Sequence, residues 1–392
     1  MKRLFWIVCI LLAACQQGNI PTSVSPSPTF VATIPADTPL PPPATMETPT
    51  SLPTVPASVV ELDGAQVQPG FSLTKYADLP RPTAFAFDSQ GRLFVTSQDG
   101  NVYVLADTDH DGRAETSSKF ASGFEFPLGI ALREPAGEIY VSSQGILTVM
   151  KDADGDGRAD PDVRILAGDL PYGLHQNDNI AFGPDGWLYV GVGSTCDACE
   201  NTNPLSASIL RFNVDTGERQ IFATGMRNPY GLAFDPVTGS LFATDNGRDD
   251  LGMDSPHEEL NHIVQGGDYG YPNCWNAQDQ PGCENTIPAV ASFEAHSSAD
   301  GTAINGGGNF PAEYRGNVFV SIFGSWLKKR VQTGIQRVRL TPKGETYGAE
   351  TGWFVLFPQG VMPLPLAFGP DGALYVGDYI NDVIYRVSYG FP

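Results

Sequence analysis

The sequence predicts an all-β fold, a six-bladed β-propeller of four-stranded antiparallel blades. One observation is a repeat in which an apolar run such as GLAF precedes a turn with Pro, Asp or Gly and a second run such as LYV. A second is that each run is short and rich in β-branched and aromatic residues, with glycine where a tight turn needs positive φ. A third is the composition, with 43 glycines and 33 prolines but only 17% charged residues, which suits short strands joined by turns.

Six copies of the repeat follow one another, the fifth of them degenerate. Their turn glycines are 46 to 77 residues apart: Gly91, Gly137, Gly186, Gly239, Gly316 and Gly372. Second hairpins follow several copies, so each unit supplies four strands, and only a ring of stacked units buries both faces of each sheet. The early segment GFSLTKYADL, from Gly70, is expected to complete the last blade and close the ring. A β-sandwich is the alternative fold.

The N-terminus has the features of a lipoprotein signal peptide. Lys2 and Arg3 precede an apolar stretch that ends in LAAC at Cys15, and this stretch is too short to span a bilayer. We therefore expect residues 1–15 to be the signal, Cys15 to be lipidated, and the protein to be extracytoplasmic and membrane-anchored only through that lipid. An ordinary secretion signal is the alternative. The Pro/Thr/Ser-rich residues 16–58 are predicted to form a disordered tether, and residues 59–392 the propeller.

The net charge argues against one class of partner, and the cysteines predict crosslinks within the chain. With 23 Lys and Arg against 44 Asp and Glu, the net charge of -21 argues against nucleic acid as a partner. Of the six cysteines, Cys9 and Cys15 lie in the predicted signal. The other four predict two disulfides in an exported chain, Cys196–Cys199 and Cys274–Cys283, with a redox CxxC or a zinc site as the alternatives.

The propeller geometry predicts where a functional site lies. The segment before each innermost strand should reach one end of the central channel. Distant residues therefore converge there, and these are Arg81, Phe126, His175, Arg227, Asn228, Thr302 and Met362.

Several motifs together resemble the glucose/sorbosone dehydrogenase family of pyrroloquinoline-quinone (PQQ) β-propellers, especially its sorbosone-dehydrogenase-like branch. The resemblance runs from about Gly70 to the C-terminus. It depends on YGLHQNDN, RNPYGL, the succession TDNGRD–EELN–GGDYGYP, and the terminal PDGALYVGDY. It implies oxidation of an aldose or polyol by hydride transfer to PQQ, with Ca²⁺ as Lewis acid. Because the chain lacks a haem motif of its own, the electrons are expected to pass to an external acceptor.

The resemblance also assigns roles to individual residues. His175 matches the catalytic base, and an imidazole of near-neutral pKa suits that role. Arg227 matches the arginine beside the quinone oxygens, and Asn228 and Asn246 are expected to contact the cofactor. The backbone carbonyls of Gly247 and Arg248 match the ligands of the catalytic calcium. Alternatively, His175 caps its loop and Arg227 is structural, paired with Glu258 or Glu259.

The chain also departs from the family pattern. Leu174 stands where an aspartate orients the histidine, blade two lacks the active-site glutamine, and Met362 stands where the family supplies a cofactor-binding arginine. Lys328 is the first of three basic residues that could restore the positive charge. Trp326 is expected to pack within its blade, with sugar binding as the alternative. These departures leave two other functions open, a non-catalytic carbohydrate-binding propeller and a calcium-dependent lactonase.

Two acidic loops share the pattern DxDxDGxxD/E. Carboxylates that alternate around a glycine turn can wrap a hard cation, so we expect structural calcium there, with solvated turns as the alternative. The predicted ligands are Asp107, Asp109, Asp111 and Glu115 in one loop and Asp152, Asp154, Asp156 and Asp160 in the other.

Overall fold

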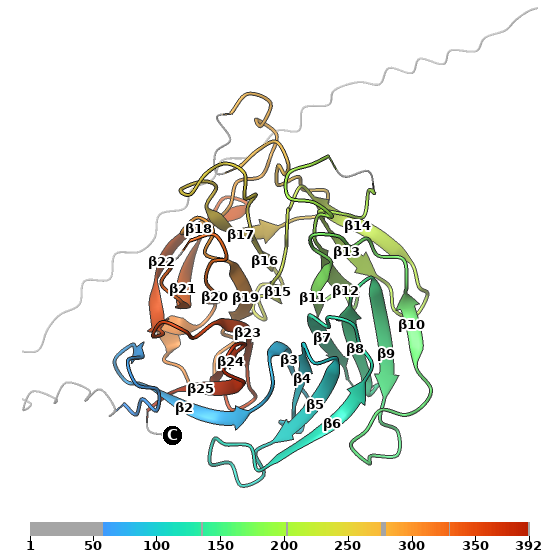
Figure 1. The fold of residues 1–392 in the computed structure, drawn as a ribbon, viewed down its shortest axis with the longest axis vertical. Coiled ribbons are helices and arrows are strands. Elements are labelled where there is room, and N and C mark those ends of the chain that lie inside the picture. Colours follow the sequence, from blue (N-terminus) through green and yellow to red (C-terminus); the bar gives the residue numbers. More distant parts are fainter. Residues whose placement is uncertain (1–57, 135, 201–202, 276–279, 329, 391–392) are drawn as a thin grey trace, which may run out of the picture. The chain divides into compact units, whose positions relative to one another are not determined.

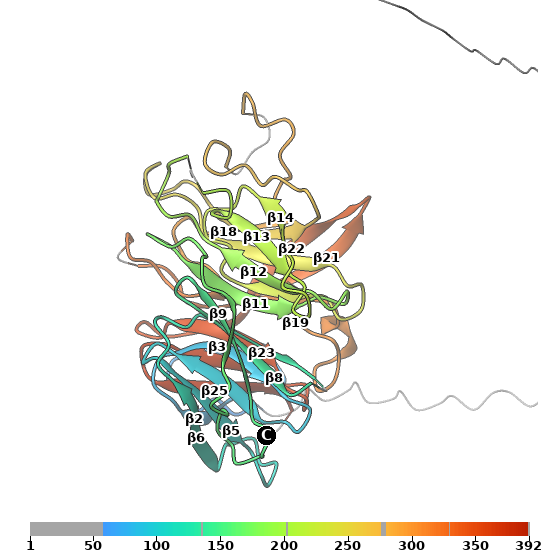
Figure 2. The same cartoon turned by 90° about the vertical axis from the view of Figure 1, so that its right-hand side faces the viewer.

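A computed structural model describes residues 58–390 except 135, 201–202, 276–279 and 329. The predicted signal peptide, most of the tether and Cys15 lie outside these residues. The described chain forms six antiparallel sheets arranged around a central axis, a six-bladed β-propeller (Figure 1). Seen from the side, the segment that joins β17 to β18 extends beyond the ring (Figure 2).

The first three blades each follow the repeat from the innermost strand outward. Blade one contains β3 (Pro82–Phe87), β4 (Leu93–Ser97), β5 (Asn101–Ala106) and β6 (Thr116–Ser122). Blade two contains β7 (Gly129–Arg133), β8 (Glu138–Ser143), β9 (Ile146–Lys151) and β10 (Arg164–Ala167). Blade three contains β11 (Asn177–Phe182), β12 (Leu188–Val192), β13 (Ser208–Phe212) and β14 (Arg219–Thr224).

The other three blades complete the ring. Blade four contains β15 (Leu232–Phe234), β16 (Leu241–Asp245), β17 (Glu258–Ile263) and β18 (Ala291–Phe293). Blade five contains β19 (Ala299–Ile304), β20 (Val318–Ile322), β21 (Gly334–Lys343) and β22 (Thr346–Leu356), with the 3₁₀ turn η1 (Ala312–Tyr314) between its first two strands. Blade six contains β23 (Pro363–Phe368), β24 (Leu374–Asp378), β25 (Val383–Tyr389) and β2 (Phe71–Asp78).

The two ends of the propeller meet in blade six, as the sequence predicted. β2 pairs antiparallel with β25, from Phe71 opposite Tyr389 to Asp78 opposite Val383. The short strand β1 (Gln66–Val67) pairs with β22, so blade five has five strands rather than the expected four. The N-terminal segment of the propeller therefore stabilises two neighbouring blades.

The core consists of apolar layers between adjacent blades. Because side chains alternate between the two faces of a strand, each sheet contributes to the layers on both of its sides. Six buried clusters fill the six interfaces; one joins β2 to blade five through Phe71, Phe319 and Phe354. Within the described residues, no helix is long and apolar enough to cross a membrane.

Candidate active site

A cavity of about 480 Å³ lies on the axis and is lined by residues from all six blades. They include Thr83 and Gln98 of blade one, Leu128 of blade two, His175 of blade three, Tyr230 of blade four, Asp300 of blade five and Leu364 of blade six. Ring closure thus gathers side chains that are almost 300 positions apart in the sequence. The volume falls within the range of about 300–1,000 Å³ that is usual for small-molecule sites.

Glycines in the inner strands let neighbouring blades approach closely below this cavity. A Cβ at Gly231 would lie 2.3 Å from the carbonyl oxygen of Asp300, and one at Gly301 would lie 2.0 Å from that of Leu364. The hydroxyl of Thr244 also donates to the Asp300 carbonyl at 2.6 Å. Such contacts fix the inner strands against each other, so the side chains that precede these glycines have defined positions around the axis.

His175 lies just before β11 and lines the cavity. Its Nδ1 is 3.0 Å from the Ser194 carbonyl oxygen and 3.1 Å from the Ser194 hydroxyl, which itself donates to the Cys196 carbonyl. Because a carbonyl only accepts hydrogen bonds, Nδ1 carries the proton and Nε2 keeps its lone pair. Burial and the charge of Arg227 lower the pKa of His175 to about 4. The imidazole is therefore neutral at ordinary pH and has one basic nitrogen.

Arg227 is buried beside this cavity, and its guanidinium is held by two carboxylates. Nε and Nη2 donate to Asp197 Oδ1 at 3.1 and 2.8 Å, and Nη2 also donates to Asp249 Oδ2 at 2.8 Å. Nη1 donates to the Asn246 carbonyl at 3.2 Å. The structural alternative named Glu258 or Glu259 as a partner; the ion pairs seen here are with Asp197, which follows β12, and with Asp249, so Arg227 is paired with carboxylates as that alternative expected.

Residues that line the cavity carry several buried oxygens without a hydrogen-bond partner among the described residues. These are Asn228 Oδ1, Asn246 Oδ1 and the Tyr230 hydroxyl. Asn246 Nδ2 donates to Asp300 Oδ1 at 2.6 Å. Burial raises the pKa of Asp300 to about 7 and that of Glu258 to about 8. An unpaired buried oxygen is costly, so this set favours a bound cation or a hydrogen-bonding ligand.

Of the two residues predicted to hold the catalytic calcium, Gly247 lines the axial cavity and Arg248 does not. The Gly247 N–H donates to Glu258 Oε2 at 2.7 Å. The Arg248 side chain points elsewhere, to Asp250 and to the Pro272 carbonyl, and lines a separate small cavity of about 30 Å³. The predicted calcium ligands of this pair are the backbone carbonyl oxygens. The direction of the Arg248 side chain does not test that prediction.

The structure brings only part of the predicted channel set into the cavity. His175, Arg227 and Asn228 line it, whereas Arg81, Phe126, Thr302 and Met362 do not. Thr302 is turned into its blade, where its hydroxyl donates to the Phe319 carbonyl. Met362 lines a neighbouring cavity of about 450 Å³, together with Lys328 and Arg330. Lys328 pairs with Glu294 at 3.2 Å, so its charge is already engaged outside the axial cavity.

The mouth of the cavity has an apolar rim. Trp326 is 78% exposed there, beside Leu327 and Leu174, and all three line the cavity. The expectation that Trp326 packs within its blade is therefore wrong. Its segment follows β20 and turns out toward the axis instead of joining the sheet, so the indole is available to stack on a ligand.

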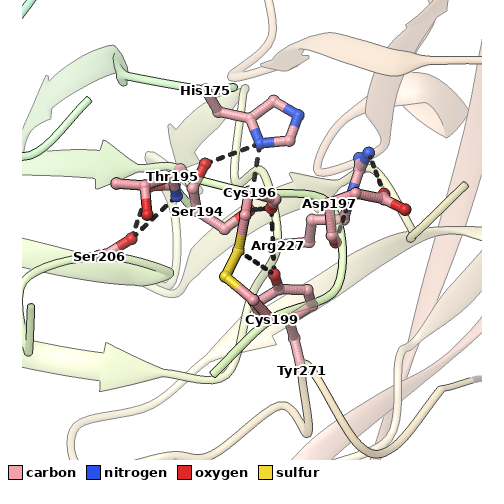
Figure 3. Close-up of a disulfide and its surroundings, with 10 residues drawn as sticks. His175, Ser194, Thr195, Cys196, Asp197, Cys199, Ser206, Arg227 and Tyr271 are labelled. Carbon is pink, nitrogen blue, oxygen red and sulfur yellow. Dashed lines mark hydrogen bonds and ion pairs between the residues drawn. A yellow bond between two sulfur atoms is a disulfide. The ribbon is translucent and has the colours of Figure 1, made fainter. Parts of the chain in front are cut away.

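Both predicted disulfides are present. Cys196–Cys199 closes a loop after β12, and Cys274–Cys283 closes one in the segment between β17 and β18. The first lies next to His175 and Arg227 (Figure 3).

The acidic loops lie on the outer hairpins of blades one and two. The carboxylates of Asp107, Asp109, Asp111 and Glu115 come within 4.8 Å of one another, as do those of Asp152, Asp154 and Asp156. Asp160 is not part of the second group and accepts the Ala153 N–H instead. The first loop therefore brings together its whole predicted ligand set, and the second brings together three of four.

Sequence reasoning missed several residues of the site. Asp197 and Asp249 were not predicted to hold Arg227, and Asp300 and Tyr230 were not predicted to line the cavity. The position of Asp197 between two cysteines was the available signal for the first. For Asp300 the signal was a carboxylate at the start of an inner strand, next to a glycine.

Residues 60–388 match the model of a family described as a domain of unknown function, DUF7133. The chain belongs to this family.

Among curated proteins, an uncharacterized protein of Borreliella burgdorferi is 28% identical over 201 residues, covering 47% of this chain and 52% of that protein. A pyrroloquinoline quinone-dependent sugar dehydrogenase of Hypocrea jecorina is 25% identical over 232 residues, 50% and 54% of the two chains. Quinoprotein glucose dehydrogenase B of Acinetobacter calcoaceticus is 27% identical over 152 residues, 31% and 30% of the two. The chain thus spans about half, or less, of the length of these relatives.

Solved structures share the fold over a longer range. The calcium structure of a Trichoderma reesei carbohydrate-active enzyme of family AA12 has a TM-score of 0.72 at 19% identity, covering 84% of this chain and 98% of that one. The holo form of the pyranose dehydrogenase PQQ domain from Coprinopsis cinerea has a TM-score of 0.71 at 15% identity, covering 84% and 99%. The predicted resemblance to PQQ-dependent sugar dehydrogenases is therefore confirmed. None of these proteins is named as a sorbosone dehydrogenase.

Proposed function

We propose that the protein oxidises an aldose or polyol at the axial cavity, with PQQ as cofactor and Ca²⁺ as its Lewis acid. The observation that carries this proposal is the placement of a neutral imidazole and a fixed guanidinium on the wall of one cavity. Support also comes from relatives named as PQQ-dependent sugar dehydrogenases.

The donor set of the cavity fits these groups. The carboxylates of Glu258 and Asp300 are hard oxygen ligands of the kind that calcium prefers, and the unpartnered amide oxygens of Asn228 and Asn246 can accept hydrogen bonds from a ligand. A divalent cation would also balance the acidic lining, which otherwise repels the carboxylates of the cofactor. Arg227, Asn228 and Asn246 would hold the cofactor, and the carbonyls of Gly247 and Arg248 would hold the cation. Bound there, PQQ would supply the hydride acceptor, and calcium would supply a Lewis acid for the quinone.

The residues of the chain supply the proton transfer and the orientation. His175 Nε2 accepts the hydroxyl proton of the substrate, because Ser194 keeps the ring proton on Nδ1. Arg227 presents a guanidinium that its carboxylate partners hold in place, so it stabilises developing negative charge without moving. Trp326 at the mouth offers a flat apolar surface for the face of a sugar ring.

The test begins with calorimetric titration of the folded protein with PQQ and CaCl₂, followed by dye reduction across a panel of aldoses and polyols. We expect saturable PQQ binding and turnover that falls by about 10²–10⁴-fold in His175→Gln. A folded protein that binds no PQQ refutes the proposal. Sugar binding without PQQ binding would instead identify a carbohydrate-binding propeller.

A calcium-dependent lactonase is the second candidate, because Glu258, Asp300, Asn228 and Asn246 place carboxylate and amide oxygens around one axial cavity. The two activities differ in their need for the histidine. Lactone hydrolysis that depends on calcium and is unchanged in His175→Ala would favour this candidate.

We also propose that the mature protein is extracytoplasmic and held to the membrane by lipid on Cys15. Metabolic labelling with a radioactive fatty acid, compared between the natural chain and Cys15→Ser, tests the anchor. Label in the natural chain that is lost in the variant is expected.

A further inference from the structure

The segment from Gly193 to Cys199 lies between the two proposed active-site side chains. It continues from β12 and is closed by the Cys196–Cys199 disulfide. Figure 3 shows His175 on one side of it and Arg227 on the other. We call residues 193–199 the disulfide loop.

On the first side, the disulfide loop fixes the imidazole. The Ser194 carbonyl and hydroxyl both accept from His175 Nδ1, and the Ser194 hydroxyl donates to the Cys196 carbonyl at 2.6 Å. The Tyr271 hydroxyl donates to the same carbonyl at 3.2 Å. The backbone continues this contact, because the His175 N–H donates to the Ser194 carbonyl at 3.1 Å. The conformation of the loop at Cys196 therefore determines how His175 is held.

On the second side, the disulfide loop fixes the guanidinium. Asp197 Oδ1 accepts from both Nε and Nη2 of Arg227, and the Asp197 carbonyl also accepts from Nε at 3.1 Å. The same Oδ1 accepts the Asp249 N–H at 2.8 Å, which places the second carboxylate against Nη2. The Asn246 carbonyl accepts from Nη1 at 3.2 Å.

The buried positive charge of Arg227 requires a carboxylate partner such as Asp197. Arg227 is only 4% exposed, and a buried guanidinium without a carboxylate partner is strongly unfavourable. Asp197 is half-buried and lies between the two bonded cysteines. The disulfide restricts the backbone on both sides of Asp197, so less conformational freedom is lost when its carboxylate is held against Arg227.

We propose that the disulfide loop is a positioning element, in which Asp197 orients Arg227 and Ser194 orients His175. Asp197 is then a positioning residue that acts through the arginine. The proposal rests on the proposed function for its kinetic consequences, but the geometry of the imidazole can be measured without any turnover.

The test compares Asp197→Ala, Asp197→Asn and the double variant Cys196→Ser/Cys199→Ser with the natural chain. Asp215→Ala is the matched control, because Asp215 makes a bidentate pair with Arg133 at 2.7 and 2.8 Å away from the cavity. Asparagine keeps an oxygen acceptor at the position and loses only the charge, so it separates geometry from electrostatics.

The first readout is the ¹⁵N spectrum of the imidazoles in the apoprotein from pH 3 to 8, with the His175 signal identified among the five histidines by its loss in His175→Gln. In the natural chain the signal should report the Nδ1–H tautomer. In Asp197→Ala the pKa of His175 should fall further, because a nearby negative charge is lost and Arg227 is less balanced. In the double cysteine variant a mixture of tautomers is expected, because Ser194 is no longer fixed.

The second readout is the steady-state kinetics of PQQ-reconstituted protein. We expect kcat to fall by about 10–100-fold in Asp197→Ala and in the cysteine variant, with a smaller change in KM, because misplaced groups act mainly on the transition state. Asp197→Asn should recover part of the loss, and Asp215→Ala should match the natural chain in both readouts.

The outcomes separate the two proposals. If the natural protein binds no PQQ and oxidises no sugar, the proposed function fails, and the imidazole spectra alone decide whether the loop positions His175. If the natural protein is active, and Asp197→Ala and the cysteine variant keep its spectra and kcat, the positioning role is refuted while the function stands.

Discussion

Replacing Gly193 with alanine would place a methyl group against His175 and Asn228. A Cβ at this position would lie 2.4 Å from the Cβ of His175 and 2.8 Å from Oδ1 of Asn228. Carbon atoms in contact are normally about 3.5–4.0 Å apart, so the imidazole must move by about 1 Å. Displacement on that scale can cost about 10²-fold in rate, and overpacking a filled site costs about 1–3 kcal/mol. We therefore expect Gly193→Ala to lose most of its kcat and to unfold at a lower temperature.

The assay is dye-linked sugar oxidation by the PQQ-reconstituted variant, together with thermal unfolding of the apoprotein. Gly352→Ala in β22 is the matched control, because nothing lies within 4 Å of a Cβ at Gly352. The control should keep the activity and melting temperature of the natural chain. If Gly193→Ala also keeps both, the close packing of His175 and Asn228 does not limit the site, and the steric reasoning is wrong.

Three further predictions concern pH and calcium. Since His175 has a pKa of about 4 and must be neutral to act as a base, kcat/KM should fall only as the pH drops through about 4, and a limb near 6.5 would contradict this. Asp300 has a folded pKa of about 7, above its unfolded value, so the folded state binds more protons between pH 4 and 7 and stability falls as the pH rises through that window. Asp300→Asn should remove the cost of ionising this buried carboxyl in the apoprotein. The free energy of unfolding at pH 8 should then exceed that of the natural chain by up to ~4 kcal/mol. Equal pH profiles of the two proteins in denaturant titrations would show that Asp300 is not the group responsible. Calcium at 100 times its dissociation constant should stabilise the fold by about 2.7 kcal/mol per structural site. In calorimetric scans, Asp109→Asn should lose the contribution of its own loop. If calcium stabilises neither protein, the acidic turns bind only water.

Much of the scaffold could be predicted because its signals are local. Each apolar run, turn glycine and β-branched residue acts within a single hairpin, and the repeat then requires a ring. The two disulfides were predictable for the same reason, since each closes a short loop. The extra strand β1 was missed because it is only two residues long and its pairing with β22 depends on where the N-terminal segment crosses blade five.

The site was predictable only in part. His175 and Arg227 carry recognisable motifs, and the ring brings them to one cavity as expected. The alternative of a carboxylate-paired Arg227 named Glu258 or Glu259 of β17, whereas the carboxylates seen to hold it are Asp197 of the disulfide loop and Asp249. For Trp326 the sequence favoured packing in the blade over sugar binding, but the side chain is exposed at the cavity mouth.

The order of residues along the chain thus determined the blades, their number and the end of the ring where the candidate site residues gather, because strand pairing within a hairpin is a short-range interaction. Which side chains meet on the axis was decided only by ring closure. There the carbonyl of one blade approaches the glycine of the previous one, and the buried charge of Arg227 is balanced by carboxylates from two different blades. This charge balance depends on the distances between side chains of different blades, and those distances are set only when all six blades are assembled.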